Sequence, residues 1–383
     1  MKVVIFADKS YNYIRPIADG LHQAFLELGC QSVIWYDGIY WLNKLKLRKV
    51  FVADIWRTFQ NLKYGSKKYI NRFWSLLTFY NLKRRKELNE CDVIVVVQNC
   101  PGTFDANNLK RLDFLRNTYH KPIINYDFHY LPNQAWWGRI KQLARPRGLE
   151  QFDWYLPVGL VTEFAIPREI PKIYNCIGMD ITKSTVGGGK LMPEQKEFRV
   201  LLDFPRPGHE ETRKREKQWL DDINVKYVEL NGRYTTAEIR KIYRSISVYI
   251  VSFRESFGLP IVELQLCGAK ILTPHKEWVP AHYLNKSPFE NGTGNLGSNF
   301  VVYQDETDFK EKLLKLKDEI DYSTNVETFQ REYPLYFHID KTELSQFISK
   351  IESGEIHADS HLDYKKYNEY ISTTQDYETS DID

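Results

Sequence analysis

The strongest constraint on the fold of this chain is the alternation of short apolar runs with longer stretches of helical periodicity. Residues 3–7 have the continuous apolar character of a strand that is buried on both faces. Residues 14–28 then repeat apolar side chains at helical spacing, and Gly29 is placed to end that helix. A second strand run follows at residues 32–36. This strand–helix–strand order predicts a doubly wound α/β domain.

The same alternation continues along the chain and divides it into two domains. With 383 residues the chain is long for one domain, and two compact domains are expected. The most linker-like composition is Ser184-Thr185-Val186-Gly187-Gly188-Gly189-Lys190, where we place the boundary. Further strands are predicted at residues 92–97, 122–127, 153–158, 198–203 and 247–251, and further helices at 106–119, 306–319 and 342–351. The predicted units are an N-terminal domain (1–183), a C-terminal domain (184–338), a helix that returns to the first domain (339–356) and a polar, flexible or loosely docked tail (357–383).

The most specific chemistry lies in the loop between strand 247–251 and the helix after it. Pro260 suits the first turn of a helix, because the N–H that it lacks would be unpaired there. The backbone N–H groups around Gly258 then face outward at a helix N-terminus, which favours anions. Glu255 lies in the loop and Glu263 about one turn inside the helix. Carboxylates accept paired hydrogen bonds, so vicinal hydroxyl groups of a sugar or ribose are natural partners for them.

The spacing of Glu255 and Glu263, with Phe257-Gly258-Leu259-Pro260 between them, resembles the signature of retaining GT-B glycosyltransferases, most closely their family 4. The resemblance covers residues 198–285, with Gly232-Arg233-Tyr234 upstream and residues 266–272 downstream. It implies an α/β chain of the GT-B fold, in which two Rossmann-like domains face each other across a cleft. It also implies transfer of a sugar from a nucleotide-sugar donor, a UDP- or GDP-sugar, to an acceptor hydroxyl with retention, in polysaccharide or glycoconjugate biosynthesis.

The resemblance also implies roles for individual residues on the donor side. Glu255 would contact the donor sugar, and Glu263 the ribose hydroxyls. The diphosphate would meet Arg206, which stands just past strand 198–203, and a second cation whose register stays open between Arg213 and Lys214. The other donor-binding positions are Ser256, Phe257, Gly258 and Leu259. Neither a cofactor nor a metal ion is implied, so fixed cations and helix-terminal N–H groups would stabilise the leaving charge.

In the resembled family a histidine commonly follows the strand that corresponds to residues 122–127 and helps to place the donor sugar. Here Asp127 stands nearest to that position, and His129 follows two residues later, on the same side of an extended segment. His129 is therefore a candidate catalytic residue, with Asp127 as its partner or substitute. The alternative is that His129 is a loop histidine with a structural role. The turn after the first strand has no glycine, which departs from the Gly-Gly turn of the family.

Residues 41–90 combine thirteen basic residues with three acidic ones and are rich in aromatic side chains. This composition is typical of helices that lie on an anionic membrane surface. Ordinary helices with a solvated basic face explain it equally well. If the stretch meets a membrane, the acceptor is expected to be lipid-linked, and otherwise a soluble carbohydrate.

Net charge and cysteine content limit the partners and the cellular compartment that we expect for this protein. A net charge of +3 excludes a polycation, and no nucleic-acid recognition motif is present, so nucleic acid is not expected as a partner. Five cysteines without a C-x-x-C spacing indicate reduced thiols and a cytoplasmic protein, peripheral to the inner face of the membrane if the basic stretch binds there. Two rival functions stay open, a GT-B sugar-nucleotide epimerase and a non-catalytic binding or scaffold protein on a GT-B frame.

Overall fold

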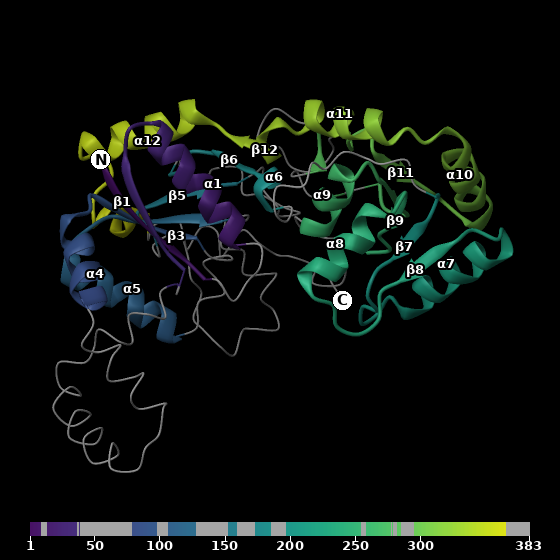
Figure 1. Cartoon of the computed structure of the whole chain (residues 1–383), viewed down its shortest axis with the longest axis horizontal. Helices are drawn as coiled ribbons and strands as arrows, with labels where there is room; N and C mark the ends of the chain where they lie inside the picture. The colour runs from purple at the N-terminus through teal and green to yellow at the C-terminus, as the bar shows by residue number, and fades with distance from the viewer. Residues whose placement is uncertain are drawn as a thin grey trace, which may run out of the picture.

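The structure is a computed structural model that describes residues 1–8, 14–36, 38, 79–97, 106–127, 152–158, 173–184, 197–253, 258–276, 278, 282–284 and 295–364. Within these residues the chain forms two α/β units that lie side by side, and each is built on a sheet of parallel strands (Figure 1). The basic stretch before residue 79, the predicted linker after residue 184 and the tail after residue 364 lie outside the described residues.

The first unit is built on a five-stranded sheet in the order β2-β1-β3-β4-β5, and every neighbouring pair is parallel. The end of β2 contacts two different helices, through its last residue, Trp35, and through Tyr36, which follows it. Trp35 donates to Glu87 of α4 at 2.9 Å, whereas the hydroxyl of Tyr36 donates to Asp19 of α1. The elements are β1 (Lys2–Ala7), α1 (Ile14–Glu27), β2 (Gln31–Trp35), α4 (Phe79–Glu90), β3 (Val93–Val97), α5 (Ala106–Tyr119), β4 (Ile123–Asp127) and β5 (Trp154–Pro157).

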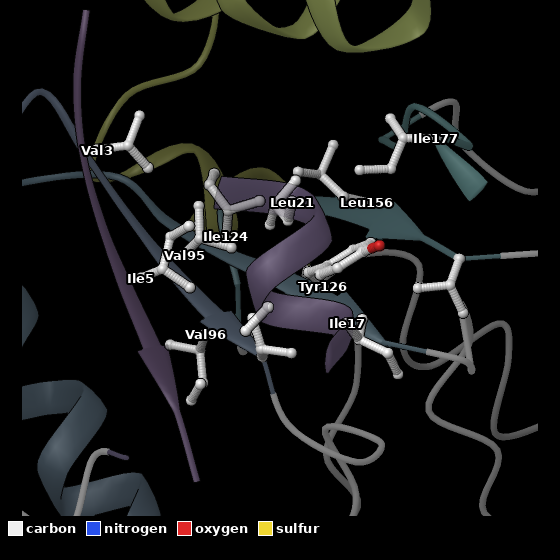
Figure 2. Packing of buried hydrophobic residues seen from close by; sticks show 14 of the residues in the cluster. Val3, Ile5, Ile17, Leu21, Val95, Val96, Ile124, Tyr126, Leu156 and Ile177 are labelled. Atoms are coloured by element: carbon white, nitrogen blue, oxygen red, sulfur yellow. The ribbon is translucent and has the colours of Figure 1, made fainter. Parts of the chain in front are cut away.

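The core of this unit lies where α1 crosses the sheet (Figure 2). Ile17 and Leu21 lie on the inner face of α1 and are at most 4% exposed. They pack over strands whose side chains are buried on both faces of the sheet. In β3, for example, all five residues are buried. Tyr126 reaches out of this core, and its hydroxyl donates to the carbonyl of Gly178 at 3.0 Å.

The second unit repeats the design with a five-stranded parallel sheet in the order β11-β10-β9-β7-β8. Its two faces carry separate cores. Ile261 and Leu264 of α9 lie in one, and Leu220 of α7 and Phe309 of α10 lie in the other. The elements are β7 (Val200–Leu202), α7 (Glu210–Asp222), β8 (Tyr227–Glu229), α8 (Thr236–Arg244), β9 (Val248–Ile250), α9 (Leu259–Leu266), β10 (Lys270–Thr273), β11 (Phe300–Val302), α10 (Glu306–Glu319) and α11 (Tyr322–Glu332).

The two passages of the chain between the units meet in a small antiparallel pairing. Strand β6 (Gly178–Asp180), which leads into the short helix α6 (Ile181–Ser184), pairs with β12 (Phe337–Ile339), which follows the 3-10 turn η6 (Pro334–Tyr336). Gly178 has a φ of +70°, and a Cβ at this position would lie 2.4 Å from the carbonyl oxygen of Leu335. Only glycine fits here, because the left-handed conformation and the close backbone both exclude a side chain.

After β12 the chain returns to the first unit. Helix α12 (Lys341–Glu352) buries Leu344 and Phe347 in the core of that unit, and Glu343 accepts from Asn175 at 2.8 Å. A 3-10 turn, η7 (Ser360–Tyr364), begins the segment that composition assigned to a tail. Its His361 is 7% exposed and places Nδ1 2.7 Å from Oδ1 of the fully buried Asp153. Ser360 and His361 of this turn are thus buried, and His361 is bound to the first unit.

These observations confirm the expected α/β fold class. Two Rossmann-like units, each a doubly wound parallel sheet, are joined so that the last helix packs on the first unit, which is the GT-B architecture (Figure 1). The helices at 106–119 and 306–319 have the predicted bounds, whereas β7 is shorter than predicted. None of the helices in the described part of the chain combines the length and apolar character needed to cross a bilayer.

The close backbone contact between Gly178 and Leu335 leads to a prediction about stability. Replacing Gly178 by Ala should lower the free energy of unfolding by about 2–4 kcal/mol, because a left-handed alanine costs roughly 1–2 kcal/mol and overpacking roughly 1–3 kcal/mol. Gly29→Ala is the matched control, since Gly29 has a φ of +77° but nothing within 4 Å of its Cβ position. Urea denaturation should therefore show a clearly larger loss for Gly178→Ala. Equal losses would mean that the close approach to Leu335 is absent.

Candidate functional site

The strand order of the second unit marks the place where a ligand is expected. The chain leaves β7 toward β8 and leaves β9 in the opposite direction, toward β10. In open α/β sheets, ligands bind outside the carboxyl ends of the strands at such a switch point. A pocket lies there, between the ends of β7 and β9. It is lined by Leu202, Asp203, Phe204, Arg206, His209, Arg213, Ser252 and Phe253.

Two groups that can carry positive charge pack on one aromatic ring of this pocket. The guanidinium of Arg206 lies 4.4 Å from the centroid of the Phe253 ring, and its Nη2 is 3.9 Å from Oδ2 of Asp203. The imidazole of His209, the residue before α7, lies 5.8 Å from the same ring. Arg206 is half exposed, so its charge is available to a ligand while the ring restricts its position.

Of the two candidates for the second cation, Arg213 lines the pocket and Lys214 does not. Arg213 joins the carboxyl ends of β7 and β8. Its Nε donates to the carbonyl of Asp203 at 2.8 Å, and its Nη1 donates to Glu229 at 2.7 Å. Hydrogen bonds from Lys217 and Arg213 lower the pKa of Glu229 and keep this cluster ionised. Lys214 is exposed on α7, outside the pocket lining.

The loop with the signature motif is described only at its two ends. Glu255, Ser256 and Phe257 lie outside the described residues, as does His129, and Asp127 is described only by its backbone at the end of β4. At the far end, Gly258 has a φ of +58° and precedes α9, with Leu259 and Pro260 in the first turn, as expected. Pro260 has no N–H, and the N–H of Ile261 donates to the carbonyl of Gly258 at 2.8 Å. The donors that this helix N-terminus can offer to an anion are therefore the N–H groups of Gly258 and Leu259.

Glu263 is buried on α9, with 8% of its surface exposed. Its Oε1 lies 3.7 Å from Nη2 of Arg240, a residue of α8. Loss of water around the carboxyl group raises the pKa of Glu263 to about 7, although the nearby guanidinium acts in the opposite direction. The carboxyl group therefore titrates near neutral pH, and hydroxyl donors from a ligand would favour its ionised form. The sequence contained no signal for Arg240 as its partner.

A second buried carboxyl group lies behind the pocket. Glu216 of α7 is 0% exposed, and its two oxygens accept from the hydroxyl groups of Ser252 at 2.5 Å and Tyr303 at 2.6 Å. Burial raises the pKa of Glu216, while the two hydroxyl donors oppose that rise. Its position four residues before the buried Leu220 was the one available sign that this glutamate faces inward.

Across the described residues, no three His, Cys, Asp or Glu side chains are grouped closely enough to hold a metal ion.

No protein-family model matches the chain, and no curated protein sequence matches it either. Several solved structures are similar to it over almost their whole length. An alpha-glucosyltransferase in complex with UDP-glucose and DNA containing an abasic site has a TM-score of 0.49 and 13% identity over 92% of this chain and 99% of that chain. Spinosyn rhamnosyltransferase SpnG with thymidine diphosphate has 0.41 and 11% over 91% and 100%. Anabaena Alr3699/HepE with UDP and glucose has 0.41 and 12% over 92% and 100%. At such scores the likeness carries no argument about activity, which rests on the residues of this chain.

The expectation that nucleic acid is not a partner is wrong. Several of the similar structures are alpha-glucosyltransferases in complex with DNA, including a 13-mer with an HMU base and a 13-mer with a central A:G mismatch. The physical reason is that net charge averages over the whole molecule, whereas a nucleic acid meets one surface. A value of +3 is compatible with a local excess of basic residues such as that of residues 41–90.

The buried Glu263 generates a prediction about pH. A glutamate that ionises at about 4.5 when unfolded and at about 7 when folded retains its proton longer in the folded state. Stability is therefore lost as the pH rises through this window. Replacing Glu263 by Gln should remove that loss, so that the unfolding free energy of the variant relative to wild type rises by roughly 2–3 kcal/mol from pH 5 to pH 8.

Urea denaturation at the two pH values measures this difference. The control is Glu311→Gln, because Glu311 is exposed on α10. Parallel pH profiles for wild type and Glu263→Gln would show that Glu263 is ionised throughout.

Proposed function

We propose that this protein is a glycosyltransferase that moves a sugar from a nucleotide-sugar donor to an acceptor hydroxyl, with retention of configuration. The observation that carries the proposal is the pocket at the carboxyl ends of β7 and β9, where Arg206 and His209 lie on the Phe253 ring. The loop from this pocket leads directly to the N-terminus of α9. Arg206 and the N–H groups of Gly258 and Leu259 would then act on the same diphosphate.

This arrangement suits a diphosphate leaving group. When the bond between the sugar and the diphosphate breaks, negative charge develops on the phosphate oxygens. Fixed positive groups that are in place before the reaction stabilise that charge without reorganisation. In this site Arg206 would supply a full charge, and the first turn of α9 would supply N–H donors and the positive end of its dipole. Arg213 is engaged by Asp203 and Glu229 and would hold the shape of the pocket.

The remaining roles follow the spacing of the signature motif. Glu263 would accept from the ribose hydroxyls, and both these donors and the nearby Arg240 would favour its ionised form. Glu255 would contact the donor sugar, with His129 or Asp127 on the side of the first unit. The intact Glu255/Glu263 pair also favours a transferase over a non-catalytic scaffold.

Arg206 has a matched control at the opposite end of β7. Arg206→Ala should weaken the binding of the nucleoside diphosphate by about 10- to 100-fold, because hydrogen bonds to charged groups contribute roughly 1.5–3 kcal/mol. Arg199 is similarly exposed but precedes β7 at its amino end, where it pairs with Glu197. Arg199→Ala should bind as wild type does in calorimetry with UDP, GDP and ADP. Equal affinities for the two variants would move the diphosphate away from Arg206.

The reaction itself is tested by the release of nucleoside diphosphate from a panel of UDP-, GDP- and ADP-sugars. We expect release with at least one donor, and the same rate in excess EDTA, because the fixed cations stabilise the leaving charge. Loss of activity in EDTA with recovery in Mg²⁺ or Mn²⁺ would refute the proposal that the reaction is independent of metal ions. Conversion of the donor sugar without release would indicate an epimerase, and binding without either reaction a scaffold.

A further inference from the structure

The burial of Glu216 requires a physical explanation. It lies in the middle of α7, a helix with mostly charged and exposed residues, yet it is fully enclosed. Enclosing a carboxyl group costs free energy unless hydrogen bonds compensate, and an apolar side chain would pack here without that cost. Two hydroxyl donors from two different strand ends compensate it, Ser252 after β9 and Tyr303 after β11.

Ser252 is held from a second direction. Its carbonyl oxygen lies 3.1 Å from Nε2 of His275, which donates to it, and the backbone N–H of His275 donates to Thr273 at the end of β10. The side chain of Ser252 is therefore held by α7, and its carbonyl by a residue that follows β10. The next residue is Phe253, the ring on which Arg206 and His209 lie.

We propose that Glu216 is a positioning residue of the phosphate-binding pocket, which acts through Ser252 on the Phe253 ring and thereby on Arg206 and His209. This inference rests on the proposed function. The hydrogen bond from Ser252 fixes where the loop leaves β9, and the loop then carries the aromatic ring to the cations. Tyr303 occupies the other oxygen of Glu216 and belongs to the hydrophobic core around Phe309, away from the pocket lining.

The two hydroxyl groups allow a matched experiment, because each makes one hydrogen bond to the same carboxyl group. Ser252→Ala should weaken binding of UDP or GDP, whichever wild type binds, by about tenfold, and leave binding of uridine or guanosine within twofold. Tyr303→Phe removes the hydrogen bond on the core side and should leave both affinities within twofold. Ser252→Thr keeps a hydroxyl group and should restore the diphosphate affinity. Calorimetry measures the diphosphates, ligand-observed NMR measures the nucleosides, and thermal unfolding measures the stability of each variant.

The outcomes separate positioning from simple anchoring. A selective loss of diphosphate affinity in Ser252→Ala that Thr restores supports the inference. A Ser252→Ala variant that loses as much thermal stability as Tyr303→Phe but binds the diphosphate like wild type overturns it, and so does an equal loss of diphosphate and nucleoside affinity. If wild type binds none of UDP, GDP and ADP, the proposed function fails and the inference fails with it.

Discussion

Both passages of the chain between the two units run through one short antiparallel pairing, β6 with β12. This pairing depends on Gly178, because its backbone lies against the carbonyl groups of Leu335 and His338 where no side chain fits. Tyr126 adds a hydrogen bond from the first core to the carbonyl of Gly178. Residues 178–180 and 337–339 therefore fix where the returning helix α12 starts.

The second unit concentrates its chemistry at the end of the sheet where the chain changes direction. Three sets of side-chain contacts lie there. Arg213 joins the ends of β7 and β8, Glu216 joins α7 to the ends of β9 and β11, and Arg206 lies on Phe253 at the surface. The contacts of Arg213 and Glu216 lie inside the protein and hold the strand ends around Arg206 in place. A site with this arrangement is held in shape before any ligand arrives.

Much of the fold could be predicted because long periodic segments carry a strong signal, as the exact bounds of α5 and α10 illustrate. The β6–β12 pairing could not, since two strands of three residues each are too short to show periodicity and lie about 160 residues apart in the sequence. The first turn of α9 and the place of Arg206 followed from local sequence. The partners of Glu263 and Glu216 did not, because Arg240, Ser252 and Tyr303 are distant in the sequence and meet these carboxyl groups only in the folded protein.

The return of α12 to the first unit has a consequence for the order in which the chain folds during synthesis. The strands of the first sheet leave the ribosome early, but Leu344 and Phe347, which close its core, are made only after the whole second unit. Until then the apolar side chains of the first unit that pack against Leu344 and Phe347 remain exposed, and exposed apolar surface promotes aggregation. The part of the molecule that is synthesised first is therefore the part that is completed last.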